Sequence, residues 1–323
     1  MALVAEPLVA IVVSVYNKAS FVSETLSSAL AQTYAATELI VVDDGSTDDS
    51  LRVARAALRA TEARLVPITN GGVSAARNLG YRHVSPDAAY VLFLDADDVL
   101  EPDAIGRLVR HLAQHPAAVA CYCDVLFVDE NGAPLAEPPD QCRWVRTAIG
   151  RRRLGSSEHV TPLDAVWSRF WALPSTLLIR RSAFDQIAGW DSDLCRPARP
   201  FHAEDKDLAI QLALFGDLHH IDDRLVRYRV LPSAHKDAVY QGLHALDAKW
   251  SAAPLTGPQR ERVRRALWFD ARVRLLDSAA ALATHQQGGR FVDHVRDVAR
   301  SLAKFATTGW RLRMAAKGST RHG

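Results

Sequence analysis

Short apolar runs alternate with amphipathic segments along the first third of the chain. Four runs are apolar enough to be strands buried on both faces, as in parallel sheets: residues 8–15, 39–42, 65–68 and 91–94. The segments between and after them repeat apolar residues at helical spacing, as in Val22, Leu26, Ala29 and Leu30. This alternation predicts an α/β fold with a doubly wound, mostly parallel, Rossmann-like sheet.

Polar residues follow directly where three of these strands end. They are Tyr16 and Asn17, then Asp43 and Asp44, then Asp95, Asp97 and Asp98. The carboxyl ends of parallel strands meet at one edge of a sheet, where open α/β sheets bind their ligands. Clustered carboxylates raise each other's pKa unless a cation lies among them, and Mg²⁺ binds one or two carboxylates together with water and phosphate oxygens. The pattern therefore indicates a metal that holds a phosphorylated ligand.

Simpler roles fit the same acids. Asp98 can cap the helix that begins near Pro102, and Asp43 with Asp44 can belong to a turn that leads into a helix. The pair Glu204-Asp205 can complement the dipole of the helix that it opens. Taken singly, these acids leave both interpretations open, and their convergence at one edge of the sheet favours a site.

The pattern changes beyond residue 118. Residues 119–128 alternate like a strand that leads to a turn at Asn131-Gly132, whereas residues 133–170 lose clear periodicity and predict loops and short helices. Strand character returns at 175–179, and Glu204-Asp205 opens a further helix. Residues 240–323 show helical spacing. We therefore expect one domain over 1–238 and a helical C-terminal region over 239–323.

Composition narrows the class of protein. Hydrophobic residues make up 48% of the chain, charged residues make up 24%, and the net charge is +2, which gives no electrostatic footprint for nucleic acid. The four cysteines have no metal-binding spacing, which suggests a reducing compartment. No signal peptide is visible and no apolar run approaches the ~20 residues of a membrane span. We expect a cytoplasmic protein that contacts a membrane at most peripherally, at its inner face.

The ends of the strands carry motifs in a definite order. They are Val13-Ser-Val-Tyr-Asn17, Asp43-Asp-Gly-Ser-Thr-Asp48, Gly72-Val-Ser-Ala-Ala-Arg-Asn78 and Leu94-Asp-Ala-Asp-Asp98, followed by Gly189-Trp-Asp191 and Glu204-Asp205. Together they resemble the family 2 glycosyltransferases of GT-A fold, over residues 7–235. The resemblance implies transfer of a sugar, with inversion, from a nucleotide-sugar with UDP as the expected nucleotide. The acceptor would be a hydroxyl group of a saccharide, a lipid-linked saccharide or another molecule, in the synthesis of cell-envelope polysaccharide, lipopolysaccharide or exopolysaccharide.

The resemblance also implies which residues bind the nucleotide. The ring of Tyr16 would lie against the base, with the backbone at Ser14 beside it and Asn17 next to it. Asp44 would accept a hydrogen bond from the ring N–H of the base, with Asp43 as its neighbour at the strand end.

Another set of residues would hold the diphosphate and its metal. Arg77 would lie near the diphosphate or, alternatively, brace Asp97 through a salt bridge. Asp95 would reach the ribose or, through water, the metal, and Asp97 would bind Mg²⁺ or Mn²⁺, with Asp98 as the alternative ligand. His235 falls where related enzymes often have a histidine or serine, so it is a further candidate ligand.

In the same resemblance, Asp205 is the general base and Glu204 supports it. A hydroxyl group is a poor nucleophile at neutral pH, so a positioned carboxylate has to take its proton. Two alternatives remain: a degenerate protein that binds a nucleotide-sugar without turnover, and a sugar-1-phosphate nucleotidyltransferase. The intact acids argue against the first. The second would need a glycine-rich, basic loop after the first strand, and Ser14-Val-Tyr-Asn-Lys18 is not one.

Overall fold

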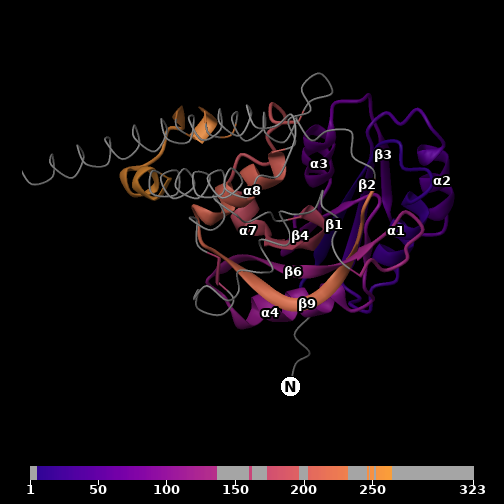
Figure 1. The fold of residues 1–323 in the computed structure, drawn as a ribbon, viewed down its shortest axis with the longest axis horizontal. Coiled ribbons are helices and arrows are strands. Elements are labelled where there is room, and N and C mark those ends of the chain that lie inside the picture. Colours follow the sequence, from indigo (N-terminus) through magenta and orange to yellow (C-terminus); the bar gives the residue numbers. More distant parts are fainter. Residues whose placement is uncertain are drawn as a thin grey trace, which may run out of the picture. The chain divides into compact units, whose positions relative to one another are not determined.

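The computed structural model describes residues 6–136, 160–161, 173–195, 203–231, 246, 248–250 and 252–263. Contacts divide the chain into two compact units, one of residues 1–161 with 171–248 and the other of residues 162–170 with 249–323. The strands of the described ranges lie in the first unit (Figure 1). Most of the helical region that the sequence predicts over 239–323 lies outside the described residues, and the boundary after residue 238 stays a prediction.

The first part of the chain forms the parallel half of the sheet, as the alternation of apolar runs predicts. Its strands lie in the order β3-β2-β1-β4, and every neighbouring pair is parallel. The strands are β1 (Val9–Val15), β2 (Thr37–Asp43), β3 (Arg64–Pro67) and β4 (Tyr90–Asp95). The helices between and after them are α1 (Val22–Leu30), α2 (Ser50–Ala57), α3 (Val73–Arg82) and α4 (Ala104–Gln114). The α/β, doubly wound fold is therefore confirmed.

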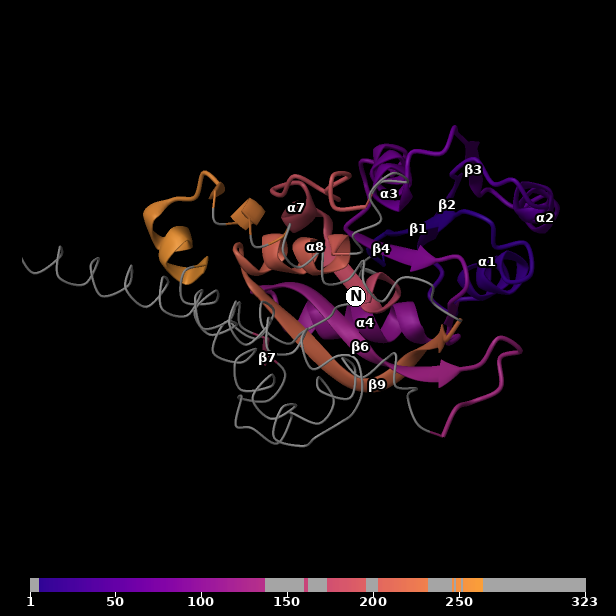
Figure 2. The same ribbon diagram turned by 45° about the horizontal axis from the view of Figure 1, so that its top comes forward.

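The sheet continues beyond β4 through mixed pairings in the order β4-β8-β6-β9-β5, and β7 pairs with β9. Only β6 and β9 are parallel among these pairs; the others are antiparallel. The strands are β5 (Val99–Leu100), β6 (Ala118–Val128), β7 (Val160–Thr161), β8 (Leu177–Arg180) and β9 (Asp217–Arg229). The 3₁₀ turn η3 (Pro174–Thr176) and the helices α7 (Arg181–Phe184) and α8 (Glu204–Ala213) complete this half. Register shifts between β6 and β9 bend the long strand β9, which Figures 1 and 2 show curving along the sheet.

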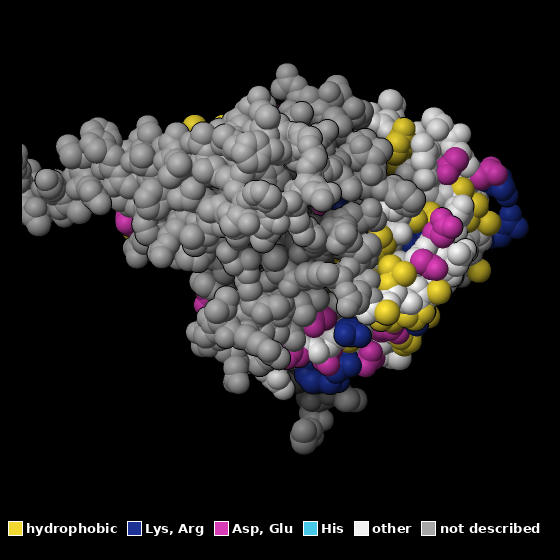
Figure 3. All heavy atoms as spheres, in the orientation of Figure 1, with side chains coloured by type: hydrophobic (Ala, Val, Ile, Leu, Met, Phe, Trp, Pro, Cys, Tyr) yellow, Lys and Arg dark blue, Asp and Glu magenta, His cyan; other side chains and the backbone are white. Residues whose placement is uncertain are grey.

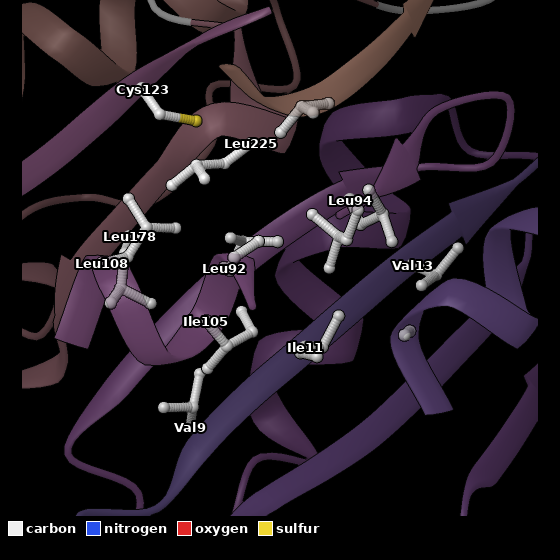
Figure 4. Packing of buried hydrophobic residues seen from close by; sticks show 14 of the residues in the cluster. Val9, Ile11, Val13, Leu92, Leu94, Ile105, Leu108, Cys123, Leu178 and Leu225 are labelled. Carbon is white, nitrogen blue, oxygen red and sulfur yellow. The ribbon is translucent and has the colours of Figure 1, made fainter. Parts of the chain in front are cut away.

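The core lies on both faces of β1 and β4, since all seven residues of β1 are buried. On one face, side chains of these two strands pack beside helix α4, as Figure 4 shows for Val9, Ile11, Leu92, Ile105 and Leu108. Burying each such side chain stabilises the fold by about 1.5–3 kcal/mol. The carboxyl ends of β1 and β4 are therefore fixed by a rigid core, which positions the polar residues that follow them.

One predicted core residue is not in the core. Leu30 is 43% exposed, whereas Val22, Leu26 and Ala29 of the same helix are buried. Successive helical residues are rotated by about 100°, so Leu30 turns away from the sheet when Ala29 faces it. In the part of the surface that Figure 3 draws in colour, hydrophobic side chains are interspersed with charged ones. Among the described residues, no helix is both long and apolar enough to cross a bilayer.

Replacing Gly80 with alanine is expected to destabilise the domain by about 1–3 kcal/mol, the usual cost of overpacking a core. A Cβ at Gly80 would lie 2.3 Å from Val12 Cγ1 and 3.3 Å from Val42 Cγ2, because α3 lies directly on β1 and β2. The matched control is Gly106→Ala in α4, where the nearest atoms, in Tyr34, are 3.9 Å away. There the better helix propensity of alanine should stabilise by up to about 1 kcal/mol. Urea unfolding of both variants measures the difference, and equal effects would contradict the close packing of α3.

Candidate active site

The loop after β1 is tied to the loop after β2. Asn17 has a φ of 52°, in the left-handed region, and its backbone N–H donates to Ser46 Oγ at 3.1 Å. Its side-chain oxygen accepts from the backbone N–H of Thr47 at 2.8 Å. Tyr16 remains 46% exposed beside this junction. The structure therefore leaves the Tyr16 ring available to a flat ligand, while Ser14, the neighbouring strand residue, is buried.

Asp44, which directly follows β2, holds the residues before α3. Asp44 is buried, and its two oxygens accept from the backbone N–H groups of Gly71 at 2.7 Å and Gly72 at 2.9 Å. Burial raises the pKa of Asp44, and these two glycine N–H groups oppose the increase. Asp43, also buried, accepts from the backbone N–H of Ser46 at 3.2 Å. Gly72, with a φ of 89°, immediately precedes α3, so Asp44 fixes the position from which this helix begins.

Arg77 of α3 joins the end of β4 to the start of α8. Its buried guanidinium lies 2.6 Å from Asp95 Oδ1, 3.1 Å from Asp205 Oδ1 and 3.8 Å from Glu204 Oε1. It also lies over the ring of Trp190, 4.2 Å from the ring centroid. Burial alone would lower the pKa of Arg77, but the three carboxylates raise it above its usual value, so the residue stays charged. We call this group of four charged residues and Trp190 the Arg77 junction.

From the sequence, Arg77 is expected either to lie near the diphosphate or to brace Asp97 through a salt bridge. In the structure it binds Asp95 and Asp205 instead, because its position in α3 faces the last residue of β4. Asp97 lies beyond the end of that strand, where the side chain of Lys18 reaches it. The predicted salt bridge between Arg77 and Asp97 is therefore not formed, and Arg77 holds Asp95 and Asp205; its place near the diphosphate stays a prediction.

Asp205 has the electrostatic setting of a proton acceptor. It is in the first turn of α8, and its side chain is 19% exposed. Burial raises the pKa of Asp205 well above its ordinary value, the Glu204 carboxylate raises it further, and Arg77 opposes both. Burial likewise raises the pKa of Glu204, against the effect of Arg77. A carboxylate whose pKa is raised toward neutrality accepts a proton from a hydroxyl group more readily than an exposed one.

Asp97, the second carboxylate of the Asp-x-Asp motif, is paired with the side chain of Lys18. Its Oδ2 lies 2.5 Å from Lys18 Nζ, and the side chains of the two residues are 18% and 29% exposed. The backbone N–H of Lys18 donates to Ser50 Oγ at 2.7 Å, which fixes the loop that carries it. Asp97 already accommodates a positive charge and offers hard oxygen ligands at a partly exposed position. Of these two residues only the Asp97 carboxylate can ligate a divalent ion such as Mg²⁺ or Mn²⁺, because the Lys18 ammonium group has no lone pair.

Asp98 has a different environment from Asp97. It is 1% exposed, and its two oxygens accept from Ser175 Oγ at 2.6 Å and from the backbone N–H of Arg229 at 3.1 Å. Burial raises the pKa of Asp98 well above its ordinary value, and the carboxylates of Asp97 and Asp95 add to the increase. It does not cap α4, which begins at Ala104. The geometry favours Asp97 over Asp98 as the metal ligand, and His235 lies outside the described residues.

Sequence reasoning missed several residues of this site. Lys18 directly follows Tyr16-Asn17, whereas Trp190 lies within the recognised motif Gly189-Trp-Asp191, where it was given no role. The side chain of Asn78 makes two hydrogen bonds with the backbone of Trp190. Its Nδ2 donates to the carbonyl oxygen at 2.7 Å, and its Oδ1 accepts from the N–H at 2.9 Å. Arg229 donates to the Asp97 carbonyl at 3.1 Å and to Glu24 Oε2 at 2.6 Å. No spacing rule connects such distant positions, so only the fold shows these contacts.

The model of the family described as glycosyl transferase family 2 matches residues 10–161. An uncharacterized glycosyltransferase of Nostoc sp., alr2836, is 37% identical over 226 residues, which are 69% of this chain and 64% of that protein. Glycosyltransferase GlyA of Streptococcus pneumoniae is 35% identical over 114 residues, which are 35% of this chain and 16% of that protein. The aligned region thus covers less than two thirds of each of these relatives.

Solved structures share the fold at low sequence identity. TarS of S. aureus, residues 1–349 in complex with UDP-GlcNAc, has a TM-score of 0.59 and 15% identity, covering 95% of this chain and 92% of that one. The mannosyltransferase PcManGT of Pyrobaculum calidifontis, in complex with GDP-Man and Mn²⁺, has a TM-score of 0.56 and 20% identity, covering 95% and 87%. The fold is thus that of GT-A glycosyltransferases.

Proposed function

Because the chain belongs to the family 2 glycosyltransferases, we propose that it moves a sugar from a UDP-linked donor to a hydroxyl group of its acceptor, with inversion. The acceptor is a saccharide, a lipid-linked saccharide or another hydroxyl compound. The enzyme uses Mg²⁺ or Mn²⁺. Its proposed setting is the cytoplasm, at the inner face of the membrane, in the synthesis of cell-envelope polysaccharide, lipopolysaccharide or exopolysaccharide.

The observation that carries this proposal is the Arg77 junction. One guanidinium binds Asp95, at the end of the strand that leads to the Asp-x-Asp motif, and Asp205, at the start of a helix far along the chain. The two carboxylates assigned to the donor side and to the acceptor side are therefore neighbours. Transfer between two bound molecules requires such closeness, because the reacting atoms have to be held about 3–3.5 Å apart.

The donor half of the proposal rests on the loops after β1 and β2. The exposed ring of Tyr16 offers a stacking surface for the base. Asp44 uses one bond at each oxygen for Gly71 and Gly72, and an ionised carboxylate has about four acceptor positions, so it can still accept from the base. TarS is in complex with UDP-GlcNAc and PcManGT with GDP-Man and Mn²⁺, which supports a nucleoside-diphosphate sugar and a divalent ion here.

The chain's own groups divide the chemistry between them. Asp97 would hold the divalent ion, with Asp95 reaching it through water, and the bound ion would neutralise the charge that develops on the leaving diphosphate. Asp205 takes the proton of the attacking hydroxyl group, and Arg77 fixes the position of that carboxylate. Glu204 adds negative charge beside Asp205, which keeps its proton affinity high. Attack from the face opposite the diphosphate inverts the anomeric carbon.

Thermal unfolding with nucleoside diphosphates tests the donor site. With UDP and Mn²⁺ at about 100 times the dissociation constant, binding adds about 2.7 kcal/mol, which corresponds to roughly 5–10 °C in Tm. With EDTA in place of Mn²⁺, the shift should disappear. GDP and ADP serve as comparison ligands. A larger Tm shift with one of them than with UDP would show that the site prefers that nucleotide base. No shift with any nucleoside diphosphate would contradict the proposal.

Turnover separates an enzyme from a degenerate binding protein. A panel of nucleotide-sugars is incubated with the chain and Mn²⁺, and release of the nucleoside diphosphate is measured with and without added acceptors. Hydrolysis of one donor, increased by an acceptor, is expected. A metal-dependent Tm shift without release from any donor would indicate a binding protein. In a separate incubation with a nucleoside triphosphate and a sugar 1-phosphate, formation of a nucleotide-sugar with release of pyrophosphate would indicate a nucleotidyltransferase.

A further inference from the structure

Three histidines gather at the end of α4, away from the Arg77 junction. His111 is in the last turn of α4, and His115, four residues later, is the C-cap of that helix, so the two side chains lie on the same side of the helix end. His219 is near the start of β9, whereas Arg229, which contacts the Asp-x-Asp turn, is at its end. Helix α4 packs against β6 and β9, as Figure 2 shows. The length of β9 thus separates the three rings from the proposed sugar-transfer site.

The three imidazole rings are in mutual contact. Ring centroids lie 4.3 Å apart for His111 and His115, 4.7 Å for His115 and His219, and 5.6 Å for His111 and His219. One nitrogen from each ring lies within 4.8 Å of the others. Two nitrogens on a tetrahedral zinc ion are roughly 3.4 Å apart, given Zn–N bonds of about 2.0–2.1 Å. The nitrogens therefore have to approach one another by at most about 1.4 Å (4.8 minus 3.4 Å) to share one ion.

The surroundings of the rings suit metal ligation. His115 Nδ1 lies 2.8 Å from the carbonyl oxygen of His111. A carbonyl only accepts, so Nδ1 is the donor, and in the neutral ring Nε2 then has a lone pair for a metal, which is the second-shell arrangement of most metal-binding histidines. Arg180 donates to the carbonyl oxygens of Leu112 at 2.6 Å and His115 at 3.2 Å, which fixes this end of the helix. All three histidines are partly exposed, so water can supply a fourth ligand.

We propose that His111, His115 and His219 bind a transition-metal dication, with Zn²⁺ as the expected ion, and that this ion joins the end of α4 to the start of β9. The ligand chemistry separates this site from the one at Asp97. Imidazole nitrogens favour Zn²⁺, Ni²⁺ and Cu²⁺, whereas carboxylate oxygens favour Mg²⁺ and Mn²⁺. The two sites therefore take different ions.

The next residue along β9, His220, belongs to a different group of side chains and provides an internal control. His220 Nε2 lies 3.0 Å from Asp124 Oδ1, its Nδ1 lies 3.5 Å from Asp222 Oδ1, and its ring contacts Tyr122. Successive strand residues point to opposite faces of a sheet, so His220 faces away from α4. Changing His220 alters the same strand and the same residue type without removing a ligand of the proposed site.

The test measures Zn²⁺ and Co²⁺ binding to the tag-free chain in excess Mg²⁺, which occupies oxygen-rich sites. One Zn²⁺ per chain is expected by calorimetry, together with the visible absorption of tetrahedral Co²⁺ and an increase in Tm. Asp97→Ala and His220→Gln should leave these signals unchanged. His115→Ala and His219→Gln should each weaken Zn²⁺ binding by at least about 100-fold, since losing even an outer-shell partner costs 10–100-fold.

Circular dichroism of each variant checks that it is folded before binding is measured. The proposal is overturned if the wild-type chain binds no Zn²⁺, or if folded His115→Ala and His219→Gln bind it as tightly as wild type. Loss of binding in His220→Gln alone would assign the ion to the Asp124 group and would equally overturn it. All readouts are of metal binding or stability, so they do not depend on the proposed transferase activity.

Discussion

Replacing Asp97 with alanine is expected to abolish metal-dependent nucleotide binding while the chain stays folded. Asp97 is a partly exposed carboxylate of the Asp-x-Asp turn, and among the described residues its side chain pairs with Lys18. A partly exposed ion pair contributes at most about 1 kcal/mol to stability, so the free energy of unfolding should change little. Affinity for UDP in the presence of Mn²⁺ should fall by at least about 100-fold, because even second-shell partners of a metal contribute 10–100-fold. Calorimetric titration with and without Mn²⁺ measures this.

The adjacent acid supplies the control for that substitution. Asp98→Ala removes two buried hydrogen bonds, to Ser175 and to the backbone of Arg229. Each buried group left without its partner costs about 1–3 kcal/mol, so this variant should lose stability rather than lose a specific contact with the metal. If Asp97→Ala binds UDP with Mn²⁺ as tightly as wild type, Asp97 is not the metal ligand.

The parallel half of the fold could be predicted from the sequence, whereas the strand β9 could not. Strands such as β1 are buried on both faces and therefore are continuous apolar runs. In β9 the buried residues include Leu218, Ile221 and Leu225, a spacing closer to a helix than to a strand. The reason is physical: register shifts against β6 interrupt the alternation of faces, so the period of two residues is lost.

The candidate site likewise has a part that could be predicted from the sequence and a part that could not. The acids at the ends of β2 and β4 were predictable, because parallel strands bring their carboxyl ends to one edge. The partners of those acids were not. Asp44 binds backbone N–H groups at residues 71 and 72, and Lys18 rather than Arg77 pairs with Asp97. Such pairings depend on the distance between loops after folding, which neither residue type nor spacing encodes.

The Arg77 junction also explains why the two halves of the site depend on each other. One buried guanidinium holds Asp95 and Asp205, and Trp190 covers its face. Removing either carboxylate would take a hydrogen-bond partner from the buried guanidinium, and a buried group left without its partner costs about 1–3 kcal/mol. Substitutions at this junction are therefore informative only when they keep the shape and hydrogen bonding of the side chain.

Replacing Asp205 with asparagine is expected to lower the transfer rate by about 10²–10⁴-fold, the usual contribution of a positioned general base. The amide keeps the shape of the carboxylate. Its oxygen can still accept from Arg77 Nη1, which lies 3.1 Å from Asp205 Oδ1 in the wild-type structure. It cannot take a proton from the acceptor. Nucleotide affinity should stay close to wild type, because the assigned donor contacts lie in other loops. Initial rates with a saturating donor, and UDP titration, measure the two quantities.

The pH profile provides a second, independent readout of the same residue. Burial, and then the Glu204 carboxylate, raise the pKa of Asp205 above its ordinary value of about 3.9. A base acts only when it is unprotonated, so kcat/KM of the wild-type chain should fall as the pH drops through this raised pKa. The loss should begin at a higher pH than for an exposed aspartate, and this limb should be absent from the residual activity of Asp205→Asn. Asp185→Asn, at an acid in a more exposed ion pair with Arg181, is the control that should keep both rate and profile. Normal turnover by folded Asp205→Asn, with an unchanged acidic limb, would remove Asp205 from the mechanism and return it to a structural partner of Arg77.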